Sequence, residues 1–210
     1  FKGKYADDVV GDKSIDFIIF SDGIKLNVHD INSATRLPSN KDDVIWAYDS
    51  GETISGLGGN DSLYGGKSND VLIGGDGNDR LMGSSGNDTY VFGRNFGNDN
   101  IIDSDYQGNV RYQKIENKIQ FVDGINLNDL VFKRNSLDLV ISTKIGNNSI
   151  VITSYFNFIS WHENDFKFIS FDDGTSISTQ ALQKLLLNAT EFDDSIWAFP
   201  GGGYIEGLGG

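Results

Sequence analysis

The sequence contains no cysteine and only two prolines, two histidines and one methionine among its 210 residues. Without cysteine, disulfide bonds, thiolate zinc sites and a cysteine nucleophile are excluded. No run of about 18 apolar residues occurs, so the sequence predicts no membrane-spanning helix, and no signal peptide is recognisable. His162 lies in the stretch HEND, which lacks the second histidine of a zinc-protease helix, and no GxSxG motif occurs. We therefore expect no catalytic residues in this segment.

Positive charge is also scarce, with 17 basic against 30 acidic residues and a net charge of −13. Such a chain repels phosphate groups, which argues against nucleic acid and anionic membranes as partners. The excess lies mainly in residues 41–105, where 12 acidic residues face four basic ones, a net charge of −8. A compact region with this charge repels itself unless cations are bound.

Glycine, in contrast, is abundant, with 26 residues, and it follows a nine-residue period. Acidic residues recur at this spacing, and an apolar residue or tyrosine follows two positions after each. The four best copies read GLGGNDSLY, GGKSNDVLI, GGDGNDRLM and GSSGNDTYV. The acidic positions are Asp43, Glu52, Asp61, Asp70, Asp79 and Asp88, and their apolar partners are Ile45, Ile54, Leu63, Leu72, Leu81 and Tyr90.

A glycine-rich turn followed by a short strand is half a coil of a β-solenoid, so two nonapeptides complete one coil. Acidic residues 18 positions apart then stack at about 4.8 Å, the spacing of neighbouring strands. Stacked carboxylates repel by roughly 3 kcal/mol per pair at an effective dielectric constant near 20. Hard oxygen ligands without histidine or cysteine favour Ca²⁺ over transition metals, and Mg²⁺ demands a stricter geometry. The pattern therefore predicts a calcium-dependent solenoid.

The repeat resembles the RTX (repeats-in-toxin) nonapeptide GGxGxDxUx from Asp42 to Asp103. The resemblance implies an all-β fold with a right-handed parallel β-roll over residues 41–105. From the stacked acidic pairs we expect this roll to hold about three to five Ca²⁺ ions. The resemblance also implies that carboxylates and glycine carbonyls of stacked turns are the ligands. After Val91 the register slips by two residues, so Asp99 is expected as the last loop aspartate. The implied metal-site residues are Asp61, Asp70, Asp79, Asp88, Asp99, Gly56, Gly58, Gly59, Gly65, Gly66, Gly74, Gly75, Gly77, Gly83 and Gly86, with Asp43 and Glu52 at the same position in the two copies that depart most from the motif.

A second, longer period of 151 residues relates the N-terminal part of the sequence to its C-terminal part. Phe20, Asp22 and Gly23 match Phe171, Asp173 and Gly174, and DDVIWA at 42–47 matches DDSIWA at 193–198. We therefore expect residues 1–40 to end a preceding unit, with a helix over Val28–Thr35, and residues 193–210 to begin another roll. The segment would then be a piece of a large tandem array.

Residues 106–192 show alternating or continuous apolar stretches between turn residues, followed by a helical pattern over Thr179–Leu187. This stretch resembles the haemolysin-type calcium-binding-related domain found beside RTX rolls. The resemblance implies a β-rich capping module that covers the strand edges of the roll and ends in a short helix.

By resemblance, the protein is expected to be a calcium-binding structural module of a secreted or cell-surface bacterial protein. It would leave the cell through the type I secretion machinery and fold in external calcium. Two alternatives stay open: a surface adhesin array with a host partner, and an auxiliary carbohydrate-binding module of a polysaccharide-modifying enzyme. Aromatic residues that could serve a glycan are Tyr155, Phe156, Phe158 and Trp161.

Overall fold

The computed structural model describes residues 17–27, 37–47, 50–102, 116–156 and 166–186. The chain divides into two compact units, Phe1–Leu37 and Pro38–Gly210. In the first unit, strands β1 (Phe17–Ile19) and β2 (Lys25–Asn27) form an antiparallel hairpin.

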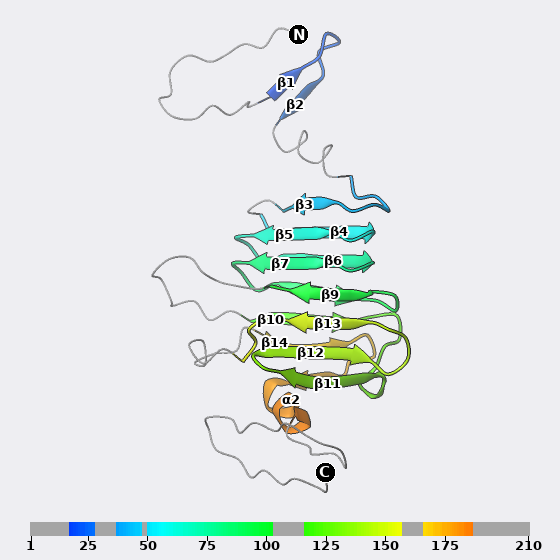
Figure 1. Ribbon diagram of the computed structural model, residues 1–210. Coiled ribbons are helices and arrows are strands. Elements are labelled where there is room, and N and C mark those ends of the chain that lie inside the picture. Colours follow the sequence, from blue (N-terminus) through cyan, green and yellow to red (C-terminus); the bar gives the residue numbers. More distant parts are fainter. Residues whose placement is uncertain (1–16, 28–36, 48–49, 103–115, 157–165, 187–210) are drawn as a thin grey trace, which may run out of the picture. The chain divides into compact units, whose positions relative to one another are not determined.

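The second unit contains a two-sheeted parallel β-roll, built from short strands that alternate between the sheets (Figure 1). Each strand pairs in parallel with the strand that comes two later in the chain, because every half coil crosses to the opposite sheet. The strands of one sheet are β3 (Val44–Trp46), β5 (Ser62–Gly66), β7 (Arg80–Ser84) and β9 (Asn98–Ile101), and those of the other are β4 (Thr53–Gly58), β6 (Val71–Asp76) and β8 (Thr89–Phe92).

The 18-residue register of this roll is the predicted one. In one sheet Ile45 lies opposite Leu63 and Leu63 opposite Leu81, while in the other Leu72 lies opposite Tyr90. All six residues at the predicted inward position are buried. The expected two-residue slip is also present, since Leu81 pairs with Ile101, 20 residues later. The prediction of a parallel β-roll is confirmed.

The strands after residue 116 extend the same two sheets. In one, β10 (Asn117–Phe121) adds in parallel to β8, followed by β14 (Phe166–Phe171) in parallel and β15 (Ser176–Ser178) antiparallel. In the other, β13 (Ser149–Ile152) adds in parallel to β9, and β12 (Asp138–Thr143) and β11 (Leu130–Asn135) follow antiparallel. A 3₁₀ turn, η1 (Leu127–Asp129), precedes β11 and is capped by Asn126. The result is a six-stranded and a seven-stranded sheet.

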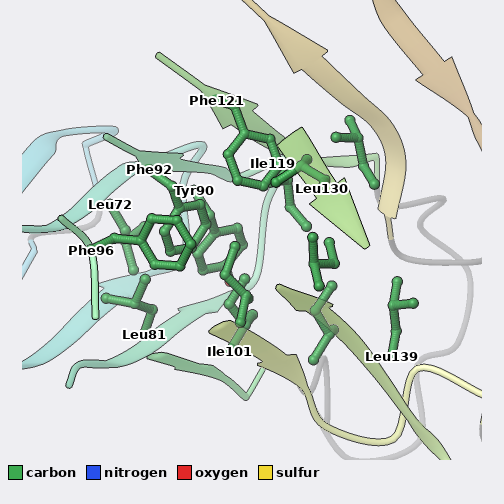
Figure 2. Packing of buried hydrophobic residues seen from close by; sticks show 14 of the residues in the cluster. Leu72, Leu81, Tyr90, Phe92, Phe96, Ile101, Ile119, Phe121, Leu130 and Leu139 are labelled. Carbon is green, nitrogen blue, oxygen red and sulfur yellow. The ribbon is translucent and has the colours of Figure 1, made fainter. Parts of the chain in front are cut away.

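One hydrophobic cluster fills the space between the sheets, from the first coil of the roll to the last strands (Figure 2). Isoleucine and leucine side chains occupy the inward positions of the first repeats, and aromatic side chains occupy the core where the repeat ends. The Phe92 ring lies edge-on to Phe96 at 5.2 Å, and Phe121 stacks on Phe171 at 5.7 Å between centroids. Because the roll and its C-terminal strands share this core, they stabilise each other through apolar burial.

The predicted β structure between residues 110 and 178 is present wherever the structure describes that stretch. The predicted helix over Thr179–Leu187 is confirmed as α2 (Thr179–Leu186). The helix expected over Val28–Thr35 and the roll expected over 193–210 lie outside the described residues. Within the described part of the chain, no helix is long and apolar enough to cross a membrane.

Candidate calcium sites

The acidic residues of the repeat lie at the ends of the loops, where the chain enters the next strand. Asp61, Asp70, Asp79 and Asp88 immediately precede β5, β6, β7 and β8, whereas Asp99 lies within β9. Their exposed fractions are between 0 and 2%. Burying an ionised carboxylate is strongly unfavourable unless positive charge or hydrogen-bond donors compensate it.

Backbone amides link these carboxylates into one ladder along each edge of the roll. On one edge the Asp61 amide donates to Asp79 Oδ1 at 2.8 Å, and the Asp79 amide donates to Asp99 Oδ1 at 2.7 Å. On the other edge the Asp70 amide donates to Asp88 Oδ1 at 2.8 Å. Each ladder therefore holds one oxygen of a carboxylate, Oδ1, against the neighbouring coil. This hydrogen bond also fixes the direction of the second oxygen, Oδ2.

The second oxygens are the feature that points to a cation. Oδ2 of Asp61, of Asp79 and of Asp99 is buried and accepts no hydrogen bond from the protein. An unsatisfied buried acceptor costs about 1–3 kcal/mol, and a charged one costs more. Three such oxygens on one edge indicate that a bound ligand compensates them.

The electrostatics of this edge agree. Desolvation by burial raises the pKa of Asp61, Asp79 and Asp99, and repulsion from the preceding carboxylate of the ladder adds to the rise, while the hydrogen bond from a backbone amide lowers the pKa. The pKa of Asp79 reaches about 6 and that of Asp99 about 8. Without a cation the ionised ladder is therefore unfavourable, and a bound cation would reverse this preference.

Backbone carbonyl oxygens lie beside the carboxylates. A methyl group added to Gly56 would collide with Asp61 Oδ2 and lie 2.5 Å from the Gly74 carbonyl oxygen. Added to Gly65, it would lie 2.9 Å from Asp70 Oδ2 and 2.6 Å from the carbonyl oxygen of Gly83. On both edges the missing side chain thus leaves room next to one carboxylate oxygen and one carbonyl oxygen of the next coil.

The glycines predicted as carbonyl ligands divide into two groups by position. Gly59, Gly77 and Gly86 lie in loops, while the others lie at the ends of strands β4 to β7: Gly56, Gly58, Gly65, Gly66, Gly74, Gly75 and Gly83. The Gly66 carbonyl already accepts a hydrogen bond from the Ser85 amide at 3.0 Å. At Gly77 the φ angle is 138°, and a methyl group would collide with the Gly59 carbonyl oxygen of the coil before it. Only glycine permits this close stacking of loops.

A site built in this way depends on carbonyl oxygens as much as on side chains. Within the described ranges, no three histidine, cysteine, aspartate or glutamate side chains gather closely enough to hold a metal by themselves. Calcium accepts six to eight oxygen ligands and tolerates irregular geometry, including backbone carbonyls. The donor set of carboxylate Oδ2 atoms and glycine carbonyls therefore fits Ca²⁺.

Asp43 and Glu52 continue the ladders through their amides but differ in their side chains. The Asp43 amide donates to Asp61 Oδ1 at 2.8 Å and the Glu52 amide to Asp70 Oδ1 at 2.7 Å. Asp43 Oδ2, however, accepts hydrogen bonds from the amide and the hydroxyl of Ser39, at 2.7 and 2.8 Å. Ser39 thus supplies to Asp43 Oδ2 the hydrogen-bond donors that Oδ2 of Asp61, Asp79 and Asp99 lacks.

Sequence reasoning missed one residue of the ladders, Asn117. Its side chain is 1% exposed, and its Oδ1 accepts a hydrogen bond from the Asp88 amide at 2.7 Å. Asn117 therefore takes the place of the next aspartate, 29 residues after Asp88 instead of 9 or 18. Asn117 is the first residue of β10 and lies two positions before the buried Ile119, the same spacing as between each repeat aspartate and its apolar partner, and this spacing is the signal that could have identified it.

A second ladder, of asparagines, runs along the loops beside the first and was also missed. The Asn78 amide donates to Asn60 Oδ1 and the Asn98 amide to Asn78 Oδ1, both at 2.9 Å. On the other edge the Asn87 amide donates to Asn69 Oδ1 at 2.8 Å. The residue before each aspartate thus joins consecutive loops, which explains the recurring Asn-Asp pair without assigning a ligand role to the asparagine.

Similar sequences and structures are found among known proteins. A family model described as the RTX calcium-binding nonapeptide repeat (4 copies) matches residues 39–63 and 55–90. The iron-regulated protein FrpA of Neisseria meningitidis serogroup C is 36% identical over 119 residues, which make up 57% of this chain and 10% of FrpA. The extracellular lipase LipA of Serratia marcescens matches with a TM-score of 0.41 and 23% identity, over 55% of this chain and 18% of the lipase chain.

Residues 39–90 therefore carry RTX calcium-binding nonapeptide repeats, and the chain is homologous to part of FrpA. The chain spans about a tenth of the length of FrpA and under a fifth of the LipA chain.

Proposed function

We propose that this chain is a calcium-dependent folding module of a larger secreted protein. In this proposal three to five Ca²⁺ ions bind between the coils of the roll. The ligands are the Oδ2 atoms of Asp61, Asp70, Asp79, Asp88 and Asp99 together with the neighbouring glycine carbonyls. Calcium would then act as a structural ion, without a chemical step.

The observation that carries the proposal is the set of buried Oδ2 atoms of Asp61, Asp79 and Asp99, which accept no hydrogen bond from the protein. A roll that worked without metal would gain stability by replacing these carboxylates with neutral residues. The chain instead repeats the carboxylate in every copy. This is what a calcium-linked fold requires, because the charge that opposes folding in the absence of metal supplies the affinity in its presence.

The location of the protein follows from the same linkage. Calcium sites of extracellular modules have dissociation constants of about 10⁻⁴–10⁻³ M, so the low calcium of the cytosol would leave such sites empty. The chain would remain unfolded inside the cell and fold outside, which suits export through the type I secretion machinery. The absence of cysteine fits a protein that is stabilised outside the cell by metal instead of disulfides.

We propose no catalytic role for this segment, since every aspartate that is buried in the described part of the chain lies in one of the ladders. The glycan-binding alternative gains no support from the candidates that the structure describes. Phe156 is 4% exposed, and the Arg134 guanidinium lies 4.5 Å from the centre of its ring. Tyr155 is partly buried and packs against the hydrophobic cluster. Phe158 and Trp161 lie outside the described residues.

Circular dichroism tests the proposal directly. In EGTA the chain should lose most of the β signal, and millimolar Ca²⁺ should restore it, whereas the same concentration of Mg²⁺ should not. Isothermal titration should then count between three and five ions per chain. Identical spectra with calcium and with EGTA would refute calcium-dependent folding.

A further inference from the structure

The hairpin β1–β2 of the first unit is a second copy of the hairpin β14–β15. The 151-residue period relates Phe17, Ile18 and Phe20 to Phe168, Ile169 and Phe171. The structure gives both hairpins the same register. Ile18 pairs with Leu26 in one, and Ile169 pairs with Ile177 in the other.

The turns of the two hairpins also agree bond for bond. The Phe20 amide donates to the Ile24 carbonyl at 2.9 Å, and the Phe171 amide donates to the Thr175 carbonyl at 3.0 Å. An aspartate closes each turn: the Ile24 amide donates to Asp22 Oδ1, as the Thr175 amide does to Asp173 Oδ1. The glycines that follow these aspartates have φ angles of 89° and 84°. The two segments therefore have the same local structure.

Their burial differs sharply. Phe20 is 43% exposed, while its equivalent Phe171 is 4% exposed. Ile169 is also buried at 4%, whereas Ile18 is only partly buried. The apolar face that is covered in the second hairpin is thus open in the first.

The structure shows what covers this face in the complete copy. Strand β10 pairs in parallel with β14, placing Ile119 opposite Ile169 and Phe121 opposite Phe171. The Phe121 and Phe171 rings stack at 5.7 Å, and the Ser170 hydroxyl donates to the Ile119 carbonyl. Among the described residues, β1 has no strand on the edge that corresponds to the β10 side of β14.

We infer that the β1–β2 hairpin is a docking surface for the C-terminal end of a β-roll of the same kind as the one in this chain. The occupant presents a strand equivalent to β10, with an isoleucine and a phenylalanine aligned to Ile18 and Phe20. It pairs in parallel with the free edge of β1 and closes a core over the exposed face. In this chain the β10 edge is already occupied by β14, so the docking roll is a further copy placed ahead of the hairpin.

The inference can be tested with the chain's own sequence. Because Phe1 corresponds to position 152 in the 151-residue period, residues 38–151 can be added in front of Phe1 to supply the preceding roll without a gap. Hydrogen exchange of the Gly23 amide, which donates to the Phe20 carbonyl at 3.0 Å, reports closure of the hairpin. We expect its protection in calcium to rise roughly 10- to 100-fold in the extended chain, the change that burial of one large apolar side chain produces.

Two substitutions in the extended chain separate docking from local folding. Phe20→Ser removes the side chain of the docking face and should return the Gly23 amide to its exchange rate in the unextended chain. Ile19→Ser alters the opposite face and introduces the residue type of the equivalent position, Ser170, so it should leave the protection unchanged. Equal exchange with and without the added roll, or equal effects of the two substitutions, would overturn the inference. Calcium titration of the same samples checks that the rolls themselves fold.

Discussion

Replacing Asp79 by asparagine should destabilise the roll in calcium but not in the absence of calcium. Asp79 is 2% exposed and lies in the middle of its ladder, bonded through Oδ1 to the Asp61 amide and through its own amide to Asp99. Asparagine keeps the accepting oxygen and the size of the side chain but removes the charge. Its amide nitrogen, in the place of Oδ2, cannot bind a metal ion.

The magnitudes follow from the structure. With calcium, a site at ten times its dissociation constant contributes about 1.4 kcal/mol, so weakening the two sites that flank Asp79 costs roughly 3 kcal/mol. Without calcium, a pKa raised from 3.8 to about 6 means that ionised Asp79 opposes folding by roughly 3 kcal/mol above that pH. An unsatisfied amide in its place costs about 1–3 kcal/mol. The variant should therefore be about 3 kcal/mol less stable in calcium and no less stable in EGTA.

Urea unfolding at neutral pH, followed by circular dichroism in calcium and in EGTA, measures both values. If the metal-free protein is too unfolded for a transition, trimethylamine N-oxide can be added equally to both proteins to populate the folded state. The matched control is Asp76→Ala, which removes an exposed carboxylate from the same nonapeptide and should leave both free energies of unfolding nearly unchanged. A loss of stability in Asp79→Asn that is equal in calcium and in EGTA would show that Asp79 is a structural hydrogen-bond acceptor and not a ligand.

Three further predictions concern the ladders and loops. Asn117→Leu should lower the free energy of unfolding by about 1–3 kcal/mol in calcium, because it leaves the buried Asp88 amide without an acceptor. Asn117→Asp keeps the acceptor and should lower the free energy of unfolding less. A larger loss for the aspartate variant in urea titrations would contradict the role of Asn117 as an acceptor. Gly77→Ala should cost roughly 2–5 kcal/mol, since it combines an unfavourable φ angle with a collision between loops, whereas Gly58→Ala, with no atom closer than 3.7 Å, should shift the melting temperature little. In EGTA the folded state binds more protons than the unfolded state, so the free energy of unfolding should fall as the pH rises from about 4 through the pKa values of Asp79, about 6, and Asp99, about 8. In calcium, where protons compete with the metal, the free energy of unfolding should rise over the same range. Equal slopes in the two conditions would contradict this account.

The nine-residue period was sufficient to predict the roll because both of its requirements are local. An apolar residue two positions after each acidic one fixes which side of the strand faces the core, and the 18-residue coil fixes the partner. Leu63 and Leu81 lie opposite each other as a result. The helix over Thr179–Leu186 was predictable for a similar reason, from a helical pattern that follows Ser178, whose hydroxyl accepts a hydrogen bond from the Ala181 amide.

The continuation of the sheets beyond the repeat was not predictable in the same way. β13 joins β9 at a separation of 51 residues, with Ile150 opposite Asp99, and β14 joins β10 at a separation of 50, with Ile169 opposite Ile119. No period in the sequence marks these separations, and each strand alone reads only as an apolar segment. The pairing depends on which surface remains open after the last repeat coil, which is a property of the folded roll.

At two of their ends the ladders avoid an uncompensated carboxylate. At the first coil, Ser39 donates two hydrogen bonds to Asp43 Oδ2, so this carboxylate is stabilised by the protein. At the last coil of the other edge, Asn117 accepts the amide hydrogen bond without adding a charge. Asp99 is the exception: it ends its ladder beneath Ile150, keeps its carboxylate, and has a pKa raised to about 8. Among the described residues no carboxylate follows Asp99 in its ladder. In the proposed calcium-bound form, an ion between Asp79 and Asp99 would therefore be the one that neutralises Asp99, and the stability of the junction between the repeat and the later strands would depend on that site.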